Sequence, residues 1–407
     1  MNNERNVKCN GEYGELRILL LNAMCGIGST GRILIDLHNQ AKEEGHEVRI
    51  ACSTVEPIKG VDPKEVFLVG SKLDYYVHNS FSRLFDHEGL YSKLATRRLI
   101  KQIREFEPDI VHLHNIHGHW INYEILFHYF SERNVKVIWT LHDCWPITGH
   151  CSHFSLLGCE QWKKACTSCN GLNVYPKTYG KGDVLRNYER KKRAFTSINN
   201  MVVVTPSQWL ADLVQASFLN IYPTQVIYNK IDLSVFQPRA SSFRKMNQLE
   251  DKRIILGVAN VWNREKGYDD FLKLSTLLDD SHKIVLVGLT REQLEALPPR
   301  IIGIQRTHNA IELAELYSAA DVFVNLTYQD NFPTVNLEAI ACGTPVISYR
   351  TGGSCESFDS ESGIAVPQGD IQGVINAIKQ VGNLKRECVL SRRNLFAKYG
   401  NYKGLYK

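Results

Sequence analysis

The chain of 407 residues contains 43% hydrophobic and 22% charged residues, a composition typical of a globular protein that is too long for one ordinary hydrophobic core. Its net charge of +5 is small for this length and gives no reason to expect nucleic acid as a partner. No stretch approaches about 18 consecutive apolar residues, and no basic segment precedes a long apolar one, so we expect neither a membrane span nor a signal peptide, and a cytoplasmic location.

Short apolar runs alternate with amphipathic stretches through the first half of the chain. The run LRILLLNAM at 16–24 precedes an amphipathic stretch at 32–45, and further runs that read as buried strands lie at 47–53, 109–115, 135–143 and 201–207. This alternation predicts a parallel sheet covered by helices.

A second series of the same kind follows a polar, charged segment at 239–253, which we interpret as a linker. Its strands are expected at 253–259, 283–289, 322–326 and 344–349. The sequence therefore predicts an α/β protein with two successive sheets. Ligands of open parallel sheets bind at the carboxyl ends of the strands, so we expect a site in the cleft between the two domains.

The segment CGIGSTGR at 25–32 joins the first expected strand to its helix. Gly28 and Ser29 would let an anion approach the free N–H groups of the helix start. A nicotinamide site is not expected, because the second strand ends in Ser53 rather than an acid. The alternative is a tight turn without a ligand.

Two acids bracket the start of a short apolar helix at 330–346, DNFPTVNLEAIACGTPV. Pro333 suits the first position of that helix and Gly343 suits its end. Glu338 lies among apolar residues on a helix with almost no polar face, so we expect it to be buried. A buried acid needs a partner.

A basic loop, NVWNREKG at 260–267, follows the first strand of the second series. Arg264 and Lys266, together with the start of the helix after Pro333, suit a diphosphate. The alternative is a solvated basic loop.

These segments resemble the retaining glycosyltransferases of family 4, which have the GT-B fold. Asp330 and Glu338 have the spacing of that family's E-x7-E motif, and VIYNKID at 226–232, REKG at 264–267 and LEAIACGTPVI at 337–347 resemble its other landmarks. The segment TLHDCWPITGHCSHFSLLGCEQWKKACTSCN at 140–170 resembles a cysteine-containing branch found in bacterial exopolysaccharide, colanic acid and O-antigen biosynthesis.

The resemblance implies two Rossmann-like domains that face each other across a cleft. The first, on the acceptor side, would span 1–228 with a cysteine-rich insertion at 150–170, and the second, which binds the donor, would span 229–385. The segment 386–407 would be helical and return to the first domain.

The resemblance also implies roles for individual residues. Glu338 would bind the ribose of a nucleotide sugar, so that its partner is the ligand, and Asp330 would contact the donor sugar. Lys266 would neutralise the diphosphate. Sugar or phosphate would also meet Asn331, Phe332 and Thr334 at the helix start, while His142 and the loop of Gly28 and Ser29 would face the donor from the first domain.

Three positions depart from the family pattern. Asp330 replaces a glutamate, Asn260 stands where an arginine is usual, and Lys230 follows the hinge asparagine where a glycine is usual. Arg264 would have to supply the missing cation.

The implied chemistry needs no cofactor. In this family the departing phosphate is thought to take the proton of the acceptor, so the protein contributes positioning and charge stabilisation. The sequence contains no D-x-D triplet, so a Mg²⁺ clamp on the diphosphate is not expected.

Histidines cluster in DIVHLHNIHGHW at 109–120, where His112 and His114 would point to the same side of a strand. We interpret His114, His117 and His119 as polar lining for an acceptor sugar. A metal site is the alternative.

Eleven cysteines, an odd number, argue against a secreted disulfide framework. Four of them fall within nineteen residues, flanked by His150 and His153, and suit a structural zinc site. Disulfides and free thiols remain alternatives. The four are Cys151, Cys159, Cys166 and Cys169.

Basic helical stretches at 93–106 and 185–195 are either solvated faces or contacts with anionic lipid. We therefore expect a retaining, metal-independent hexosyltransferase in the cytoplasm, with peripheral attachment to the cytoplasmic face of the inner membrane if the basic helices contact lipid. Its substrates would be a nucleotide-sugar donor and a polyprenyl-linked saccharide acceptor of O-antigen, capsule or exopolysaccharide biosynthesis. A non-catalytic nucleotide-sugar-binding relative and a sugar-nucleotide epimerase are the alternatives.

Overall fold

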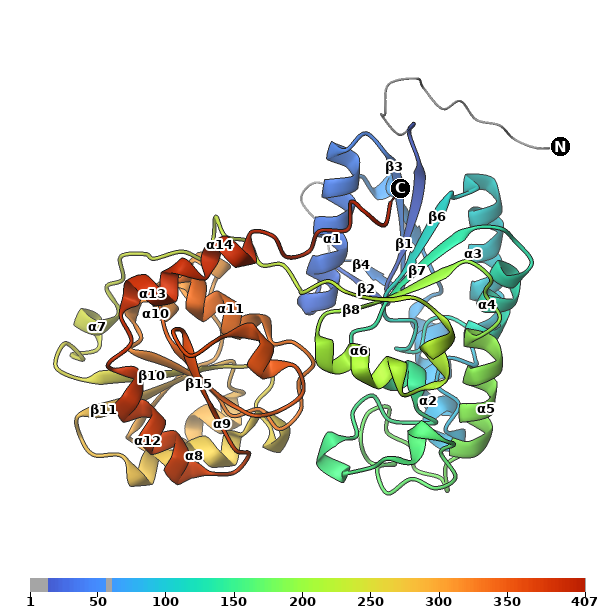
Figure 1. Ribbon diagram of the computed structural model, residues 1–407. Coiled ribbons are helices and arrows are strands. Elements are labelled where there is room, and N and C mark those ends of the chain that lie inside the picture. The colour runs from blue at the N-terminus through green and yellow to red at the C-terminus, as the bar shows by residue number, and fades with distance from the viewer. Residues whose placement is uncertain (1–13, 56–60, 407) are drawn as a thin grey trace. The chain divides into compact units, whose positions relative to one another are not determined.

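The computed structural model describes residues 14–55 and 61–406, which form two compact units, each built on a parallel sheet covered by helices (Figure 1). Unit 1 contains the described residues up to Pro206, together with Leu210–Ile227 and the described part of 401–407. Unit 2 contains Ser207–Trp209 and Tyr228–Gly400. The expected α/β architecture with two successive sheets is confirmed.

The main sheet of unit 1 has seven parallel strands in the order β5-β3-β1-β6-β7-β8-β9. Most residues of its inner strands are apolar and buried, as expected for a parallel sheet that helices cover on both faces. In chain order the strands are β1 (Arg17–Leu21), β3 (Glu47–Cys52), β5 (Val66–Leu68), β6 (Ile110–Leu113), β7 (Lys136–Thr140), β8 (Met201–Thr205) and β9 (Thr224–Val226), and β2 (Met24–Cys25) pairs separately with β4 (Thr54–Val55).

Helices and short 3-10 turns connect these strands. The helices are α1 (Gly28–Glu43), α2 (Lys72–Phe85), α3 (Lys93–Phe106), α4 (Tyr123–Ser131), α5 (Val184–Phe195) and α6 (Gln208–Gln215). The 3-10 turns are η1 (Pro63–Glu65), η2 (Trp145–Ile147), η3 (Ser155–Leu157), η4 (Gln161–Lys163) and η5 (Phe218–Ile221).

The sheet of unit 2 has six parallel strands in the order β12-β11-β10-β13-β14-β15. Residues alternate along β10, so Ile254 packs into a core with α10 and α11, and Ile255 packs into a core with α8 and α12 on the other face. The strands are β10 (Arg253–Val258), β11 (His282–Val287), β12 (Ile301–Ile304), β13 (Val322–Asn325), β14 (Val346–Tyr349) and β15 (Gly363–Val366).

The helices of unit 2 are α7 (Phe243–Met246), α8 (Tyr268–Leu277), α9 (Arg291–Glu295), α10 (Ala310–Ala319), α11 (Thr334–Ala341), α12 (Ile371–Val381), α13 (Arg386–Ser391) and α14 (Arg393–Phe396), with 3-10 turns η6 (Arg264–Lys266) and η7 (Ser354–Ser357).

The interpretation of 239–253 as a linker is wrong. This segment contains α7 and belongs to unit 2, where Arg244 forms a salt bridge of 2.6 Å with Asp321 and donates to the carbonyl oxygen of Ala319. The polar composition reflects these surface contacts, and the chain passes from unit 1 to unit 2 at Ile227 and Tyr228.

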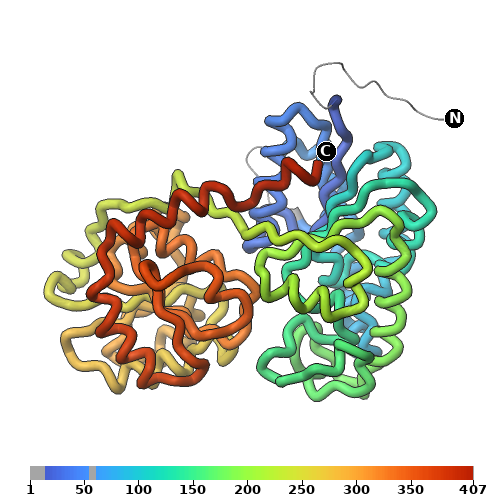
Figure 2. Tube along the Cα trace, viewed as in Figure 1, coloured from blue at the N-terminus to red at the C-terminus, as the bar shows by residue number. Residues whose placement is uncertain are grey.

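The last described residues pack into the core of unit 1, where they lie beside α1 (Figure 2). The hydroxyl of Tyr406 lies 2.8 Å from Nδ1 of His112 on β6, and Tyr402 lies 3.4 Å from the hydroxyl of Thr140 on β7. Both α13 and α14 cluster with unit 2.

Candidate active site

The segment between β13 and β14 carries the two acids of the motif. Helix α11 begins at Thr334, with Pro333 as its N-cap rather than its first residue, and ends before Gly343, whose φ of +85° suits a glycine. No side chain caps the start of this helix, so its first N–H groups are available to an anion.

Glu338 lies on α11 and is buried, as expected. We expected a bound ligand to be the partner of Glu338. The protein itself also supplies one, because the hydroxyl of Tyr317 on α10 donates a hydrogen bond of 3.1 Å to Oε2 of Glu338. A buried carboxylate needs such a donor even before substrate binds. Sequence reasoning missed Tyr317, which reads as an ordinary aromatic residue on the apolar side of a helix.

Lys266 and Asp330 come together although 64 positions separate them. Nζ of Lys266 lies 2.8 Å from Oδ2 of Asp330, and both side chains are partly exposed. The contact forms because the η6 loop packs against the chain after β13: the backbone N–H of Tyr328 donates to the carbonyl oxygen of Glu265 at 2.7 Å.

Gly267 permits this packing. Its φ is +74°, and a Cβ atom there would lie 2.3 Å from the carbonyl oxygen of Leu326. The glycine at the end of the REKG segment therefore positions Lys266 beside Asp330.

The other residues at the start of α11 have protein contacts of their own. Oδ1 of Asn331 accepts a hydrogen bond of 2.6 Å from the hydroxyl of Ser207, and the ring of Phe332 packs 5.0 Å from that of Tyr228. Thr334 is partly exposed at the first position of the helix. Asn331 and Phe332 thus help to fix the backbone that leads into α11.

Arg264 lies in η6 with Lys266, but its side chain is exposed, and no salt bridge of Arg264 occurs among residues 14–55 and 61–406. The two departures at Asn260 and Lys230 are also exposed. The structure therefore brings Lys266 and Asp330 together in two neighbouring loops of unit 2, places Glu338 on the helix α11 that follows Asp330, and leaves Arg264 at the surface.

In unit 1, Gly28 and Ser29 form the first turn of α1. Both are exposed, Gly28 has a φ of +68°, and no side chain caps this helix start. The free N–H groups and the positive end of the helix dipole suit an anion.

His142 follows β7 and belongs to a stack of imidazoles. Its Nε2 lies 2.9 Å from Nδ1 of His114, and the ring centroids of His114 and His112 are 4.4 Å apart. Burial lowers the pKa of His142 to about 4 and that of His112 to about 3. These imidazoles are therefore neutral near pH 7, so His142 can exchange hydrogen bonds but brings no positive charge.

The interpretation of His114, His117 and His119 as lining for a sugar is wrong, because all three side chains are buried and paired within unit 1. Nε2 of His117 lies 2.8 Å from Asp143, and Nδ1 of His119 lies 2.5 Å from Glu88. Strand alternation predicted only that His112 and His114 point to the same side, and it could not predict the pairing of His117 with Asp143 or of His119 with Glu88.

The ten described cysteines are free thiols. The four that were grouped from their spacing, Cys151, Cys159, Cys166 and Cys169, line one small cavity of unit 1. Among the residues that the structure describes, no helix is both long and apolar enough to cross a membrane.

Comparison with known proteins gives a consistent assignment. The family model described as Glycosyltransferase Family 4 matches residues 30–235, just over half of the chain, and the model described as Glycosyl transferases group 1 matches residues 252–383.

Two relatives and one solved structure illustrate the similarity. The Escherichia coli protein named "Putative colanic acid biosynthesis glycosyl transferase WcaC" is 23% identical over 89% of this chain and 90% of its own length. The N,N'-diacetylbacillosaminyl-diphospho-undecaprenol alpha-1,3-N-acetylgalactosaminyltransferase of Campylobacter jejuni is 29% identical over 29% of this chain and 32% of its own. The Anabaena protein HepE, solved in complex with UDP-glucose, superposes with a TM-score of 0.65 and 14% identity over 96% of this chain and 97% of its own.

The order and direction of the strands in both units, the motif acids of unit 2 and the family matches together show that this chain belongs to glycosyltransferase family 4 and has the GT-B fold.

Proposed function

We propose that the protein is a retaining hexosyltransferase that moves a sugar from a nucleotide-sugar donor to a polyprenyl-linked saccharide during the synthesis of a bacterial surface polysaccharide such as O-antigen, capsule or exopolysaccharide. The observation that carries the proposal is the pair of Lys266 and Asp330, 2.8 Å apart, in the segments that follow β10 and β13, together with the buried Glu338 on α11. A cation, a partly exposed acid and a buried acid suit a diphosphate, a sugar and a ribose respectively.

The donor would bind to unit 2, where its diphosphate, its sugar and its ribose would each meet one of these three side chains. Lys266 and the free N–H groups at the start of α11 would hold the diphosphate, and Asp330 would accept hydrogen bonds from hydroxyls of the sugar. Glu338 would accept hydrogen bonds from the ribose hydroxyls. UDP-glucose is the first donor to test, because the structurally similar HepE was solved with it.

Catalysis would rest on charge stabilisation. Negative charge grows on the leaving diphosphate as the glycosidic bond breaks, and Lys266 would stabilise it without a metal ion. The departing phosphate would accept the proton of the acceptor hydroxyl on the face of attack, so the product keeps the anomeric configuration of the donor. A neutral His142 on unit 1 would contribute a hydrogen bond rather than a charge.

A lipid-linked acceptor would require contact with a membrane, and unit 1 has a surface that fits one. Helix α2 exposes Leu73, Tyr76 and Leu84 along one face, with exposed fractions of 72%, 63% and 56%. Lys72, the first residue of α2, is exposed next to Leu73.

Apolar side chains beside a cation suit an anionic bilayer. We propose that the protein attaches peripherally to the cytoplasmic face of the inner membrane, and the exposed face of α2 supports this proposal. The acceptor named for the Campylobacter relative is an undecaprenyl diphosphate carrier, which supports the same class of acceptor here.

A panel of UDP-, GDP-, dTDP- and CDP-sugars tests the proposal. We expect one donor to raise the melting temperature, because a ligand of the native state stabilises it. With that donor and a polyprenyl-linked saccharide, in the presence of EDTA, we expect a glycoside whose anomeric configuration matches that of the donor by NMR. Binding without transfer or hydrolysis would instead identify a non-catalytic relative, and a donor isomerised without an acceptor would identify an epimerase.

A further inference from the structure

Two imidazoles of unit 1, those of His114 and His142, share one hydrogen bond. Nδ1 of His114 lies 2.9 Å from Nε2 of His142. The ring planes are inclined by only 14°, and the ring centroids are 5.2 Å apart, much farther than the two nitrogen atoms. Each nitrogen therefore points at the other in the plane of its own ring, which is a favourable geometry for a hydrogen bond.

Both rings are neutral near pH 7. Burial holds the pKa of His114 well below its usual value, as it does that of His142. A neutral imidazole has one N–H group and one acceptor nitrogen, so one of these two rings must donate the shared hydrogen bond and the other must accept it. The direction of the bond decides which nitrogen of His142 carries the proton.

The side chain of His114 is held in place by its neighbours. The ring of His112 lies against it with centroids 4.4 Å apart, and the indole N–H of Trp139 donates to the backbone carbonyl oxygen of His114 at 3.1 Å. His112 is itself fixed, because its Nδ1 lies 2.8 Å from the hydroxyl of Tyr406 and its Nε2 lies 2.8 Å from that of Thr140. Nδ1 is therefore the nitrogen of His114 that faces His142.

The other nitrogen of His114 indicates the direction of the bond. Nε2 is buried and has no hydrogen-bond partner within the described part of the chain. If Nδ1 accepted, Nε2 would carry the proton and a buried N–H group would be left unpaired. If Nδ1 donates, only a lone pair is left unpaired. Proteins leave a buried N–H group unpaired more rarely than a buried acceptor, so Nδ1 of His114 is the donor.

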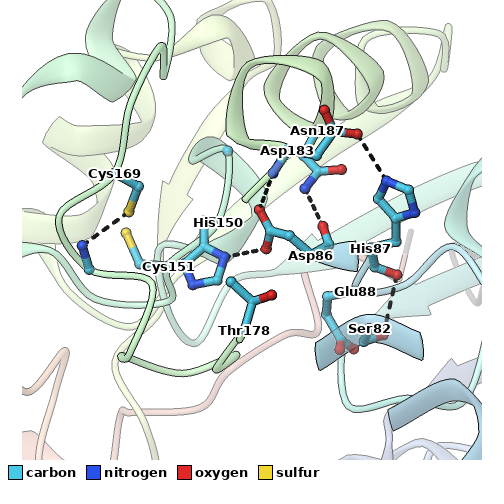
Figure 3. Close-up of polar contacts among 12 residues, drawn as sticks. Ser82, Asp86, His87, Glu88, His150, Cys151, Cys169, Thr178, Asp183 and Asn187 are labelled. Carbon is cyan, nitrogen blue, oxygen red and sulfur yellow. Dashed lines mark hydrogen bonds and ion pairs between the residues drawn. The ribbon is translucent and has the colours of Figure 1, made fainter. Parts of the chain in front are cut away.

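His150 shows the same pattern with a partner that can only accept. Its Nδ1 is hydrogen-bonded to a carboxylate oxygen of Asp86 (Figure 3), and its Nε2 is buried without a hydrogen-bond partner among the residues that the structure describes. Because a carboxylate accepts, the proton must lie on Nδ1, and in the neutral ring the unpaired nitrogen is again an acceptor.

We propose that His114 is a positioning residue that keeps His142 in the tautomer with its proton on Nδ1. Nε2 of His142 accepts the hydrogen bond from His114, so the single N–H group of the neutral ring is the one on Nδ1.

The consequence for the substrate rests on the proposed function, in which His142 faces the donor. An Nδ1–H group can donate a hydrogen bond but cannot accept one. It suits a hydroxyl, carboxylate or acetamido oxygen of the donor sugar and does not suit an ammonium group. His114 thus restricts the class of sugar that His142 can recognise.

NMR of the wild-type chain, labelled with 15N in its histidine rings, tests the tautomer without any substrate. Correlations from the carbon-bound ring protons report which nitrogen carries a proton, and the signals of His142 are identified by their absence in His142→Asn. We expect a protonated Nδ1 and an unprotonated Nε2. A protonated Nε2 of His142 in the wild type overturns the proposal.

A change at position 114 tests whether this residue sets the tautomer. His114→Asp places a carboxylate, which accepts, where the N–H donor stood, and should bring a proton onto Nε2 of His142. The matched control Asp86→Asn alters the surroundings of His150 and should leave the signals of His142 unchanged. If Nε2 of His142 stays unprotonated in His114→Asp, another group sets the tautomer and His114 has no positioning role.

Analogues of UDP-glucose, or of the sugar nucleotide identified in its place, test the contact with the sugar separately. Each has one sugar hydroxyl replaced by hydrogen or by fluorine, which accepts a hydrogen bond weakly and cannot donate one. At the hydroxyl that His142 contacts, we expect about tenfold weaker binding of the deoxy analogue and a smaller loss for the fluoro analogue, with neither loss in His142→Ala.

Equal losses for the deoxy and the fluoro analogue would overturn donation from His142 to the sugar. Binding of no sugar nucleotide at all would instead overturn the proposed function, and the NMR measurement would still decide whether His114 fixes the tautomer.

Discussion

The hydroxyl of Tyr317 on α10 donates a hydrogen bond of 3.1 Å to the buried carboxylate of Glu338 on α11. The acid proposed to bind ribose is therefore also part of the packing between two helices of unit 2. Replacement of Glu338 should then affect both substrate binding and stability.

For Glu338→Ala we expect loss of donor binding by calorimetry and a loss of about 1–3 kcal/mol in the free energy of unfolding, because the buried hydroxyl of Tyr317 loses its hydrogen bond to Oε2 of Glu338. Tyr317→Phe removes the hydroxyl alone and should cost about 1 kcal/mol while donor affinity changes little. If Glu338→Ala unfolds at lower denaturant but binds the donor as the wild type does, the acid is structural only.

Removal of the cation beside Asp330 should chiefly reduce turnover. Loss of the Lys266 ammonium is expected to cost about 2–4 kcal/mol of transition-state stabilisation, because charge grows on the leaving group. Steady-state kinetics of Lys266→Ala with the identified donor measure this loss directly.

Arg264 tests whether a second cation reaches the diphosphate. If it does, Arg264→Ala should also lose about 2–4 kcal/mol, although the side chain is exposed in the structure. Turnover close to that of the wild type would mean that Lys266 and the helix N-termini act without it.

Gly267 should not tolerate a side chain. In Gly267→Ala the new methyl group would meet the carbonyl oxygen of Leu326 and the backbone would be held at an unfavourable φ, so we expect a loss of stability of about 1–3 kcal/mol and a displaced Lys266. Gly404→Ala is the matched control, because no atom lies within 4 Å of the position of its Cβ. Equal melting temperatures for the two variants would contradict this account.

The neutral imidazole of His142 should make unit 1 less stable in acid. Burial lowers the pKa of His142 from 6.5 to about 4, so between these values the unfolded chain binds a proton that the folded chain does not. The contribution of His142 to stability is complete above pH 6.5 and decreases as the pH falls toward 4. Chemical denaturation measures this effect. Between pH 7 and pH 5 the free energy of unfolding should decrease less for His142→Asn than for the wild type.

The exposed face of α2 should bind anionic lipid. We expect the wild type to co-sediment with vesicles that contain phosphatidylglycerol and less with pure phosphatidylcholine. The triple variant Leu73→Gln, Tyr76→Gln, Leu84→Gln should stay in the supernatant. Leu277→Gln, at an exposed leucine of unit 2, is the control, and vesicle binding unchanged in the triple variant would exclude this face.

Much of the fold could be predicted from the sequence, because inner parallel strands are long apolar runs. The edge strands β5 and β9 were missed because each has only three residues, too few to form a pattern. Strands β12 and β15 were also missed. Their runs, IIGI and GIAV, are short and contain glycine, which weakens the signal of a strand.

The candidate site was accessible to sequence analysis only in part. The spacing of Asp330 and Glu338 identified both acids, but neither the contact of Lys266 with Asp330 nor that of Tyr317 with Glu338 follows from local pattern, since each joins separate elements. The spacing grouped four cysteines that line one cavity, whereas the hydrogen bond between His150 and Asp86 joins residues 64 positions apart.

The position of Tyr402 and Tyr406 in the core of unit 1 has a consequence for biosynthesis. A ribosome delivers the first strands of unit 1 early, but the aromatic rings that complete this core emerge only after all of unit 2 has been made. Unit 2 is continuous apart from Ser207–Trp209, so its parts are together in the nascent chain before those of unit 1. Unit 1 is thus the first unit to be translated and the last unit whose hydrophobic core can form completely.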